Sequence, residues 1–197
     1  MTDPRPVCGI DVSLSSTGVA FIDPATGDLA AATVRSRGRA TDRLPENLER
    51  IATLGLAIAT AAVEKQPQLA VVESALFTTA DKDTSAHRRA GLWWSVAQHL
   101  RAAGIPMAEV SPAELKKFTT GKGNATKSDM LRCLDHDWPG HGVSGPGKYD
   151  IADAAYLAAI GVYGVGGALP ARLGANAYRS ATVEKSMTHR TLQEPAP

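Results

Sequence analysis

The stretch V-C-G-I-D-V-S-L-S-S-T-G, residues 7–18, decides the fold. Its first four residues form a short, mostly apolar run, which is typical of a central strand in a sheet covered on both faces. The run ends on Asp11 and then breaks into a turn of Ser, Thr and Gly. A carboxylate on a buried strand is costly without a partner. Asp11 therefore either caps the turn through Ser13 or Ser15, or it needs a cation, a hydrogen-bond cage or a catalytic role.

Length and composition predict one folded domain with a tail. The chain has 197 residues, 44% of them hydrophobic, which suits a single domain with a proper core. We place this domain at residues 1–164 and a poorly ordered C-terminal tail at residues 165–197, where Gly, Pro, Ser and Thr show no steady periodicity. The net charge is +1, so any affinity for nucleic acid must come from a local patch.

Several features predict a soluble, cytoplasmic protein with no membrane association. Cys8 and Cys133 lie far apart and match no zinc spacing, so we interpret them as reduced thiols. Charged residues and glycines interrupt every apolar stretch before it is long enough to span a bilayer. The first residues, M-T-D-P-R-P, lack the pattern of a signal peptide.

The order of predicted elements indicates an α/β fold. Short apolar runs predict strands, and apolar residues at helical spacing predict helices. The strands are expected at residues 7–10, 18–22, 29–34, 69–73 and 107–110, and the helices at 45–64, 84–103, 112–119, 125–134 and 149–163. Three strands in a meander followed by crossover connections predict a five-stranded mixed sheet with helices on both faces.

Two acids stand three residues apart at the start of the last predicted helix. In Asp150-Ile-Ala-Asp153 both carboxylates lie on one helix face, among small apolar residues. Two like charges about 4 Å apart repel by roughly 1 to 4 kcal/mol, and a divalent cation would reverse the sign of that energy. Taken alone, the same pattern also fits a solvated acidic helix face.

Two further carboxylates end predicted strands. Asp11 ends the first strand and Glu73 the fourth, so neighbouring positions in the sheet would bring them together. A helix packed across that edge would add Asp150 and Asp153. Hard oxygen ligands of this kind suit Mg²⁺ or Mn²⁺. Two such ions can activate a water and stabilise the leaving oxygen of a phosphodiester.

These motifs carry a resemblance to a known family. The segments Gly9-Ile-Asp11 with Ser16-Thr-Gly18, Val71-Val-Glu73 and Asp150-Ile-Ala-Asp153-Ala154 look like the active-site motifs of the RuvC-like Holliday junction resolvases, which have the RNase H-like fold. That family also carries two lysines eleven residues apart, with Gly-x-Gly between them. Lys116 and Lys127 match this spacing. The resemblance covers about residues 7–164. The loop that follows Glu73 departs from the family pattern, which favours a phage-type or divergent member.

The resemblance implies a structure-selective endodeoxyribonuclease. Such an enzyme resolves four-way DNA junctions by metal-dependent phosphodiester hydrolysis and makes paired symmetrical nicks as a homodimer. By resemblance, the metal ligands would be Asp11, Glu73, Asp150 and Asp153, holding two Mg²⁺ ions for which Mn²⁺ can substitute. Lys116 and Lys127 would contact the scissile region. The dimer would form through the second helix, around Trp93 and Trp94.

The chain departs from the family pattern in the loop after Glu73. The family often has an aromatic residue three positions after this glutamate, where it stacks on the opened junction, and this chain has Leu76 there, with Phe77 next. It also has Ser13 where the family often has glycine. Expected DNA contacts are Leu76, Phe77, Arg88, Arg89, Lys116, Lys117, Lys122 and Lys127, to which Arg35, Arg37, Arg39 and Arg43 would add a basic surface. Scattered surface arginines serve solubility equally well, whereas phosphate contacts would weaken steeply with salt.

Two other functions also fit parts of the sequence. The turn G-I-D-V-S-L-S-S-T-G also resembles the phosphate-binding turn of sugar-kinase and actin-like ATPase domains, but no second Gly-rich phosphate loop follows it. A non-catalytic junction-binding module would be favoured if an acid were missing, and none is. Among nucleases, forks and flaps remain alternatives to the four-way junction.

Overall fold

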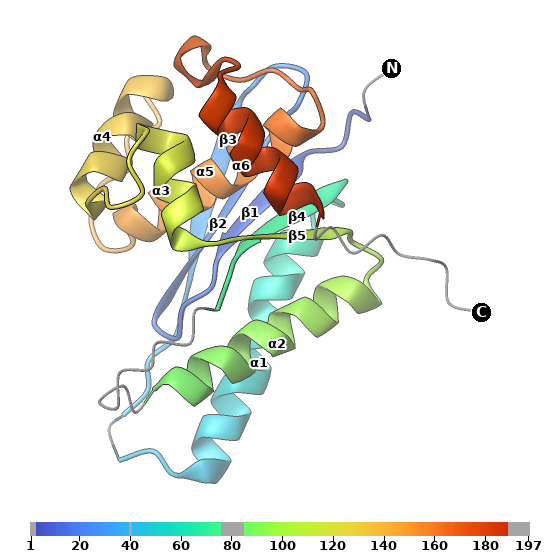
Figure 1. The fold of residues 1–197 in the computed structure, drawn as a ribbon. Helices are drawn as coiled ribbons and strands as arrows, with labels where there is room; N and C mark the ends of the chain where they lie inside the picture. Colours follow the sequence, from blue (N-terminus) through green and yellow to red (C-terminus); the bar gives the residue numbers. More distant parts are fainter. Residues whose placement is uncertain (1–2, 40, 76–84, 189–197) are drawn as a thin grey trace.

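The computed structural model describes residues 3–39, 41–75 and 85–188 and contains one five-stranded mixed sheet. The strand order is β3-β2-β1-β4-β5 (Figure 1). The first three strands form an antiparallel meander, whereas β4 and β5 run parallel to β1. The strands are β1 (Val7–Asp11), β2 (Ser16–Ile22), β3 (Leu29–Arg35), β4 (Leu69–Glu73) and β5 (Met107–Val110). The α/β class and the mixed sheet predicted from the sequence are confirmed.

Helices cover both faces of this sheet. One face packs on α1 and α2, and the other packs mainly on α5, with α3, α4 and α6 around it (Figure 1). The helices are α1 (Leu44–Val63), α2 (Ala86–Ala102), α3 (Pro112–Thr120), α4 (Lys127–Asp137), α5 (Lys148–Gly164) and α6 (Ala177–Thr188). Among the described residues, no helix is long and apolar enough to cross a membrane.

The two-residue period of the strands determines which side chains face α5. In β1, Val7 belongs to the core under α5, whereas Cys8 and Ile10 belong to the core under α1 and α2. Side chains alternate along a strand, so Asp11 faces the α5 layer. By the same alternation in β4, Val71 lies under α5, and Glu73 points to that layer too.

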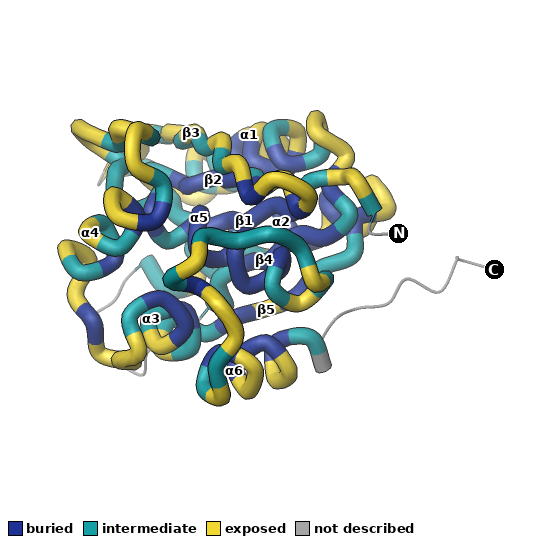
Figure 2. Tube along the Cα trace, turned by 90° about the horizontal axis from the view of Figure 1, so that it is seen from above, coloured by how far each residue is buried: buried dark blue, intermediate teal, exposed yellow. Residues whose placement is uncertain are grey.

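Small residues allow α5 to lie directly on the central strands. A Cβ atom added at Gly9 would lie 2.0 Å from the carbonyl oxygen of Ala154, and one added at Gly18 would lie 2.0 Å from that of Asp150. Neither separation is possible for a real side chain, so only glycine permits this packing. Figure 2 shows the result, with the central strands β1 and β4 buried between the layers. The glycines thereby fix the position of the helix that carries Asp150.

Residues 165–188 differ from the predicted tail. They contain a 3₁₀ helix, Ala171–Leu173, and the helix α6, which packs on α3, α5 and β5. The buried face of α6 is largely polar, so apolar residues at helical spacing do not predict this helix. Thr182 and Ser186 are buried, and each hydroxyl donates a hydrogen bond of 2.9 Å to a carbonyl oxygen one turn earlier in α6. The predicted end of the folded part at residue 164 is therefore too early.

Helix α4 also extends beyond its predicted range. It begins at Lys127 behind a capping box of Thr126 and Asp129 and ends at Asp137, three residues after the predicted end. The extension brings Asp137 into the core, where its side chain is fully buried and bonded to Arg172. Arg172, a partner far along the chain, thus stabilises the last residues of α4, which composition alone assigns to a loop.

Candidate active site

Asp11 is the buried centre of the site. It is 9% exposed at the end of the central strand. Burial raises the pKa of its carboxyl group well above the ordinary value, and the nearby charges of Glu73, Asp153 and Asp150 raise it further. Only Lys127 acts in the opposite direction among the main causes. The capping alternative is not observed, because Thr17, and not Asp11, bonds to the backbone of Ser13 across the turn.

Glu73 lies beside Asp11 at the end of the adjacent parallel strand. The register pairs Ile10 with Val72, so the next residues along the two strands are the two acids. Burial raises the pKa of Glu73 to about 7, and the charge of Asp153 adds to this rise. Lys127 and Lys116 oppose it, as does a side-chain hydrogen bond with Asp11.

Asp153 completes the site from the α5 side. Burial raises its pKa to about 6, and the charge of Asp150 on the same helix contributes. Lys127 and Lys116 lower it. The acids predicted at residues 11, 73, 150 and 153 therefore share one electrostatic environment, and so do the two lysines predicted beside them.

The donor set fits a hard divalent cation, although its carboxylates are not all gathered at one point. Among the described residues, no three His, Cys, Asp or Glu side chains are grouped closely enough to hold a metal ion as they lie. The structure therefore brings Asp11 and Glu73 together, whereas it does not draw three of the predicted acids around one point. The chemistry of the set still suits Mg²⁺ or Mn²⁺, because it offers carboxylate oxygens and no sulfur or imidazole.

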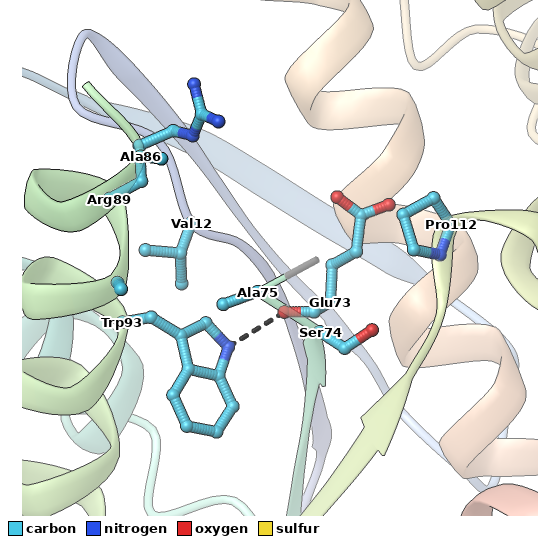
Figure 3. A pocket seen from close by; sticks show the side chains of 9 residues that line it. Val12, Glu73, Ser74, Ala75, Ala86, Arg89, Trp93 and Pro112 are labelled. Carbon is cyan, nitrogen blue, oxygen red and sulfur yellow. Dashed lines mark hydrogen bonds between the residues drawn. The ribbon is translucent and has the colours of Figure 1, made fainter. Parts of the chain in front are cut away.

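A small cavity opens next to Glu73 (Figure 3). Its volume is about 210 Å³, and its lining includes Val12, Arg89 and Trp93. Trp93 Nε1 donates a hydrogen bond of 2.8 Å to the carbonyl oxygen of Glu73. The end of β4 is thereby fixed to α2, a contact that the sequence pattern does not predict. Its only sequence signal is a tryptophan on the helix after the acidic strand.

The two tryptophans of α2 have different environments. Trp93 is half-buried against Glu73, whereas Trp94 is 58% exposed, and their ring centroids are 5.0 Å apart in an edge arrangement. Exposed leucines of α1, namely Leu44, Leu48 and Leu56, share this outer layer of the molecule. Of the predicted pair, Trp94 is therefore the one available to a partner.

The structure places the expected DNA contacts unevenly. Leu76 and Phe77 lie outside the described residues. Arg88 packs towards Asn47 of α1, with 3.5 Å between Arg88 Nη1 and the side-chain oxygen of Asn47. Arg89 lines the cavity beside Glu73. Lys117, Lys122 and Lys127 are exposed and Lys116 is half-buried, all on α3, on α4 or in the loop between them.

The fold and the site together define a class of protein. Carboxylates from two adjacent parallel strands and a crossing helix, with two lysines beside them, form the acidic centre of an RNase H-like sheet. The solved RuvC of Thermus thermophilus matches this chain with a TM-score of 0.62 and 19% identity, covering 84% of this chain and 99% of its own. The T. thermophilus RuvC in complex with a Holliday junction substrate matches with a TM-score of 0.63 and 15% identity, covering 80% and 94%. These matches confirm the RNase H-like fold.

Sequence comparison identifies the family. A crossover junction endodeoxyribonuclease RuvC of Acidovorax sp. is 33% identical over 175 residues, which is 85% of this chain and 89% of the relative. One from Paracidovorax citrulli is 30% identical over 171 residues, 85% and 88% of the two chains. No family model matches the chain. The chain belongs to the RuvC crossover junction endodeoxyribonuclease family, which favours a nuclease over the ATPase alternative.

Proposed function

We propose that this chain is a divalent-metal-dependent endodeoxyribonuclease that resolves four-way DNA junctions by paired symmetrical nicks. The observation that carries the proposal is the buried Asp11, surrounded by three further carboxylates and opposed by two lysines. Family membership supports the activity, since the relatives are named as crossover junction endonucleases. A non-catalytic junction-binding module would have no reason to keep this repulsive cluster at the end of its central strand.

Asp11, Glu73, Asp150 and Asp153 would hold the cation, Mg²⁺ or Mn²⁺, with two ions in the site. The chemistry that such ions supply is activation of a water and stabilisation of the leaving oxygen. The raised pKa values of Asp11, Glu73 and Asp153 indicate that ionisation of all these carboxyl groups together is electrostatically unfavourable. A bound cation relieves that repulsion, so the cluster favours cations over neutral occupants.

Lys116 and Lys127 supply positive charge near the carboxylates. The charges of both lysines lower the pKa of Glu73 and of Asp153. A phosphate that approaches the carboxylates meets the same two ammonium groups. We propose that they offset the negative charge of the scissile phosphodiester, which a carboxylate cluster would otherwise repel.

We further propose a homodimer, and branched DNA as its substrate. Trp94 of α2 and three leucines of α1 expose large apolar side chains, and exposed apolar surface on these two helices supports an interface there. Two copies joined there would present two active sites, one to each of two of the four strands of a junction. Both cysteines are free thiols, which fits the cytoplasm.

The test is metal-dependent cleavage of end-labelled DNA by the full chain. The panel comprises a four-way junction, a fork, a flap and a linear duplex, each with Mg²⁺ and with chelator. We expect paired nicks on the four-way junction only, and only with the metal. Efficient cleavage of forks or flaps would broaden the substrate to branched DNA generally. If none of the four DNA substrates is cleaved, the proposed nuclease activity is refuted.

The matched variants are Asp11→Asn and Asp28→Asn. The first neutralises the central carboxylate with little change of volume, while the second does the same at an exposed position in the turn before β3. We expect Asp11→Asn to lose cleavage and keep junction binding, and Asp28→Asn to retain both. Unchanged cleavage by Asp11→Asn would reject the metal assignment.

A further inference from the structure

The helix that carries Lys116 is short and is held at its start by the C-terminal segment. α3 has nine residues, and helices of that length are marginal without outside support. At its N-terminus Ser111 and Glu114 form a capping box, with Ser111 Oγ donating to Glu114 Oε2 at 2.6 Å. The other oxygen of Glu114 forms an ion pair with Lys185 of α6.

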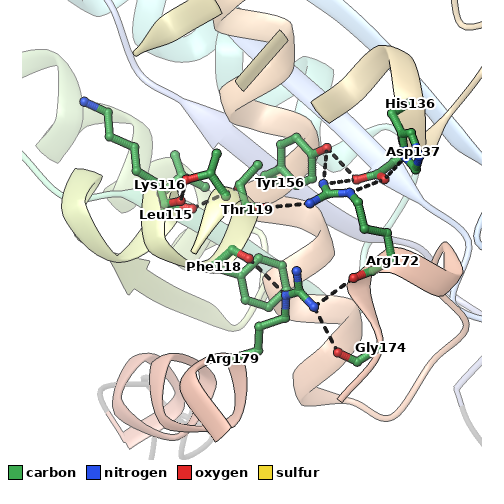
Figure 4. Close-up of polar contacts among 11 residues, drawn as sticks. Leu115, Lys116, Phe118, Thr119, His136, Asp137, Tyr156, Arg172, Gly174 and Arg179 are labelled. Atoms are coloured by element: carbon green, nitrogen blue, oxygen red, sulfur yellow. Dashed lines mark hydrogen bonds and ion pairs between the residues drawn. The ribbon is translucent and has the colours of Figure 1, made fainter. Parts of the chain in front are cut away.

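The end of α3 is held by two arginines of the same segment. Arg172 Nη1 donates to the carbonyl oxygen of Thr119 at 2.8 Å, and Arg179 Nε donates to that of Phe118 at 3.0 Å. The last carbonyls of a helix carry partial negative charge and lack partners within the helix. Figure 4 draws both contacts. The two guanidinium groups therefore satisfy the carbonyl oxygens at this end and stabilise the helix.

Both arginines are fixed in turn by the surrounding structure. Arg179 is only 4% exposed and also donates through Nη1 to the carbonyl oxygens of Arg172 and Gly174, at 2.8 and 3.1 Å. Arg172 Nε donates to Asp137 Oδ1 at 2.6 Å, and the hydroxyl of Tyr156 donates to Asp137 Oδ2 at 2.6 Å. The contact thus ties α3 to α4, to α5 and to the C-terminal segment at once.

Lys116 projects from the middle of this clamped helix. Its side chain extends away from the arginine network in Figure 4, and its charge acts on Glu73 and Asp153. We infer that Arg172, Arg179 and Lys185, which we term the C-terminal clamp, position Lys116 over the carboxylates. They are positioning residues and touch no substrate. The inference rests on the proposed nuclease function.

A double-mutant cycle in the full chain tests the clamp. Arg179→Gln removes the guanidinium, and it is made both in the wild-type chain and in Lys116→Ala. The readouts are the single-turnover cleavage rate of a four-way junction at saturating enzyme, the junction affinity without metal, and amide hydrogen exchange of residues 112–120. Loss of overall stability alone would slow cleavage equally in both backgrounds, whereas positioning through Lys116 would not.

We expect Arg179→Gln to slow cleavage about tenfold in the wild-type chain and less than about twofold in Lys116→Ala, as for coupled residues. Hydrogen exchange should quicken over residues 112–120, with junction affinity unchanged. Arg179→Lys should be intermediate, because a single ammonium keeps the charge but lacks the guanidinium fork that reaches several carbonyls. Equal slowing in both backgrounds, or wild-type cleavage by Lys116→Ala, would overturn the inference.

Two further variants keep the test decisive. Arg132→Gln removes an exposed arginine paired with Asp129 on α4, and it should leave exchange in α3 unchanged. If Arg179→Gln does not fold, Lys185→Ala replaces it, because it removes the exposed ion pair at the other end of α3. Its smaller effect on the cleavage rate should also vanish when it is made in Lys116→Ala. If the wild-type chain cuts no junction, the proposed function fails, and hydrogen exchange still decides whether the clamp holds α3.

Discussion

Replacement of Gly18 by alanine tests how the fold positions the acidic helix. The added Cβ would lie 2.0 Å from the carbonyl oxygen of Asp150 and 3.0 Å from the Cβ of Ala154. Real Cβ atoms essentially never approach another atom within 3.0 Å, so the first turn of α5 must retreat by about 1 Å or more. Backbone atoms cannot rotate out of the way as the end of a flexible side chain can.

This retreat should weaken both stability and activity. Overpacking of a tight core costs up to about 3 kcal/mol, which lowers the melting temperature of a domain of this size by about 6 to 12 °C. Because misplacement by about 1 Å of a catalytic group can cost about a hundredfold in rate, junction cleavage should fall at least tenfold at 25 °C, where the variant is still folded.

The matched control is Gly91→Ala on α2. Its added Cβ would meet only Cδ1 of Ile51, at 3.8 Å, and alanine favours a helix over glycine by about 0.5 to 1 kcal/mol. This variant should melt slightly higher and cut normally. Calorimetry and a single-turnover cleavage assay measure both effects. A Gly18→Ala protein that melts and cuts like the wild type would refute the packing argument.

Three further predictions concern single contacts. Trp93→Phe removes the hydrogen bond to the Glu73 carbonyl, so it should lower the free energy of unfolding in urea by about 1 kcal/mol and slow cleavage. Trp94→Phe should change neither the stability nor the rate. Equal behaviour of the two variants would dismiss the role of Trp93. Trp94→Glu should shift the chain towards monomer in sedimentation velocity, and an unchanged dimer would place the interface elsewhere. Burial alone would raise the pKa of Asp137, but hydrogen bonds from Arg172 and Tyr156 outweigh it and hold the pKa below its ordinary value. The stability from this ionised carboxyl is therefore full above the unfolded pKa of about 4 and is lost as pH falls through the lower folded pKa. Asp137→Asn should cost about 3 kcal/mol at neutral pH and flatten the fall in unfolding free energy below pH 4; a variant with the wild-type acid profile would contradict this.

The sequence was most informative where the pattern of apolar residues and the pairing of the strands point to the same place. Asp11 and Glu73 could be placed at one edge because each ends an apolar strand, and parallel pairing of β1 with β4 brings their ends together. Asp150 and Asp153 followed from helical spacing. The close seating of α5 depends on Gly9 and Gly18, whose role shows only when the helix and the strands are seen in contact.

The C-terminal segment could not be predicted in the same way. Its order depends on Arg172 and Arg179, which bond to carbonyl oxygens of α3 more than fifty residues away in the sequence. Such contacts leave no periodic trace, and hydroxyl groups fill the buried face of α6. The apolar pair Val183 and Met187, one helical turn apart, was the sequence signal that α6 did carry.

We expect the four carboxylates to form one divalent cation site. Calorimetric titration of Mn²⁺ into the wild-type chain, Asp11→Asn and Asp28→Asn tests it without any DNA. We predict binding to the wild type and to Asp28→Asn and none to Asp11→Asn, which should nevertheless melt no lower than the wild type without metal, because it loses a buried charge among like charges. Wild-type Mn²⁺ affinity in Asp11→Asn would contradict a cation site built around Asp11.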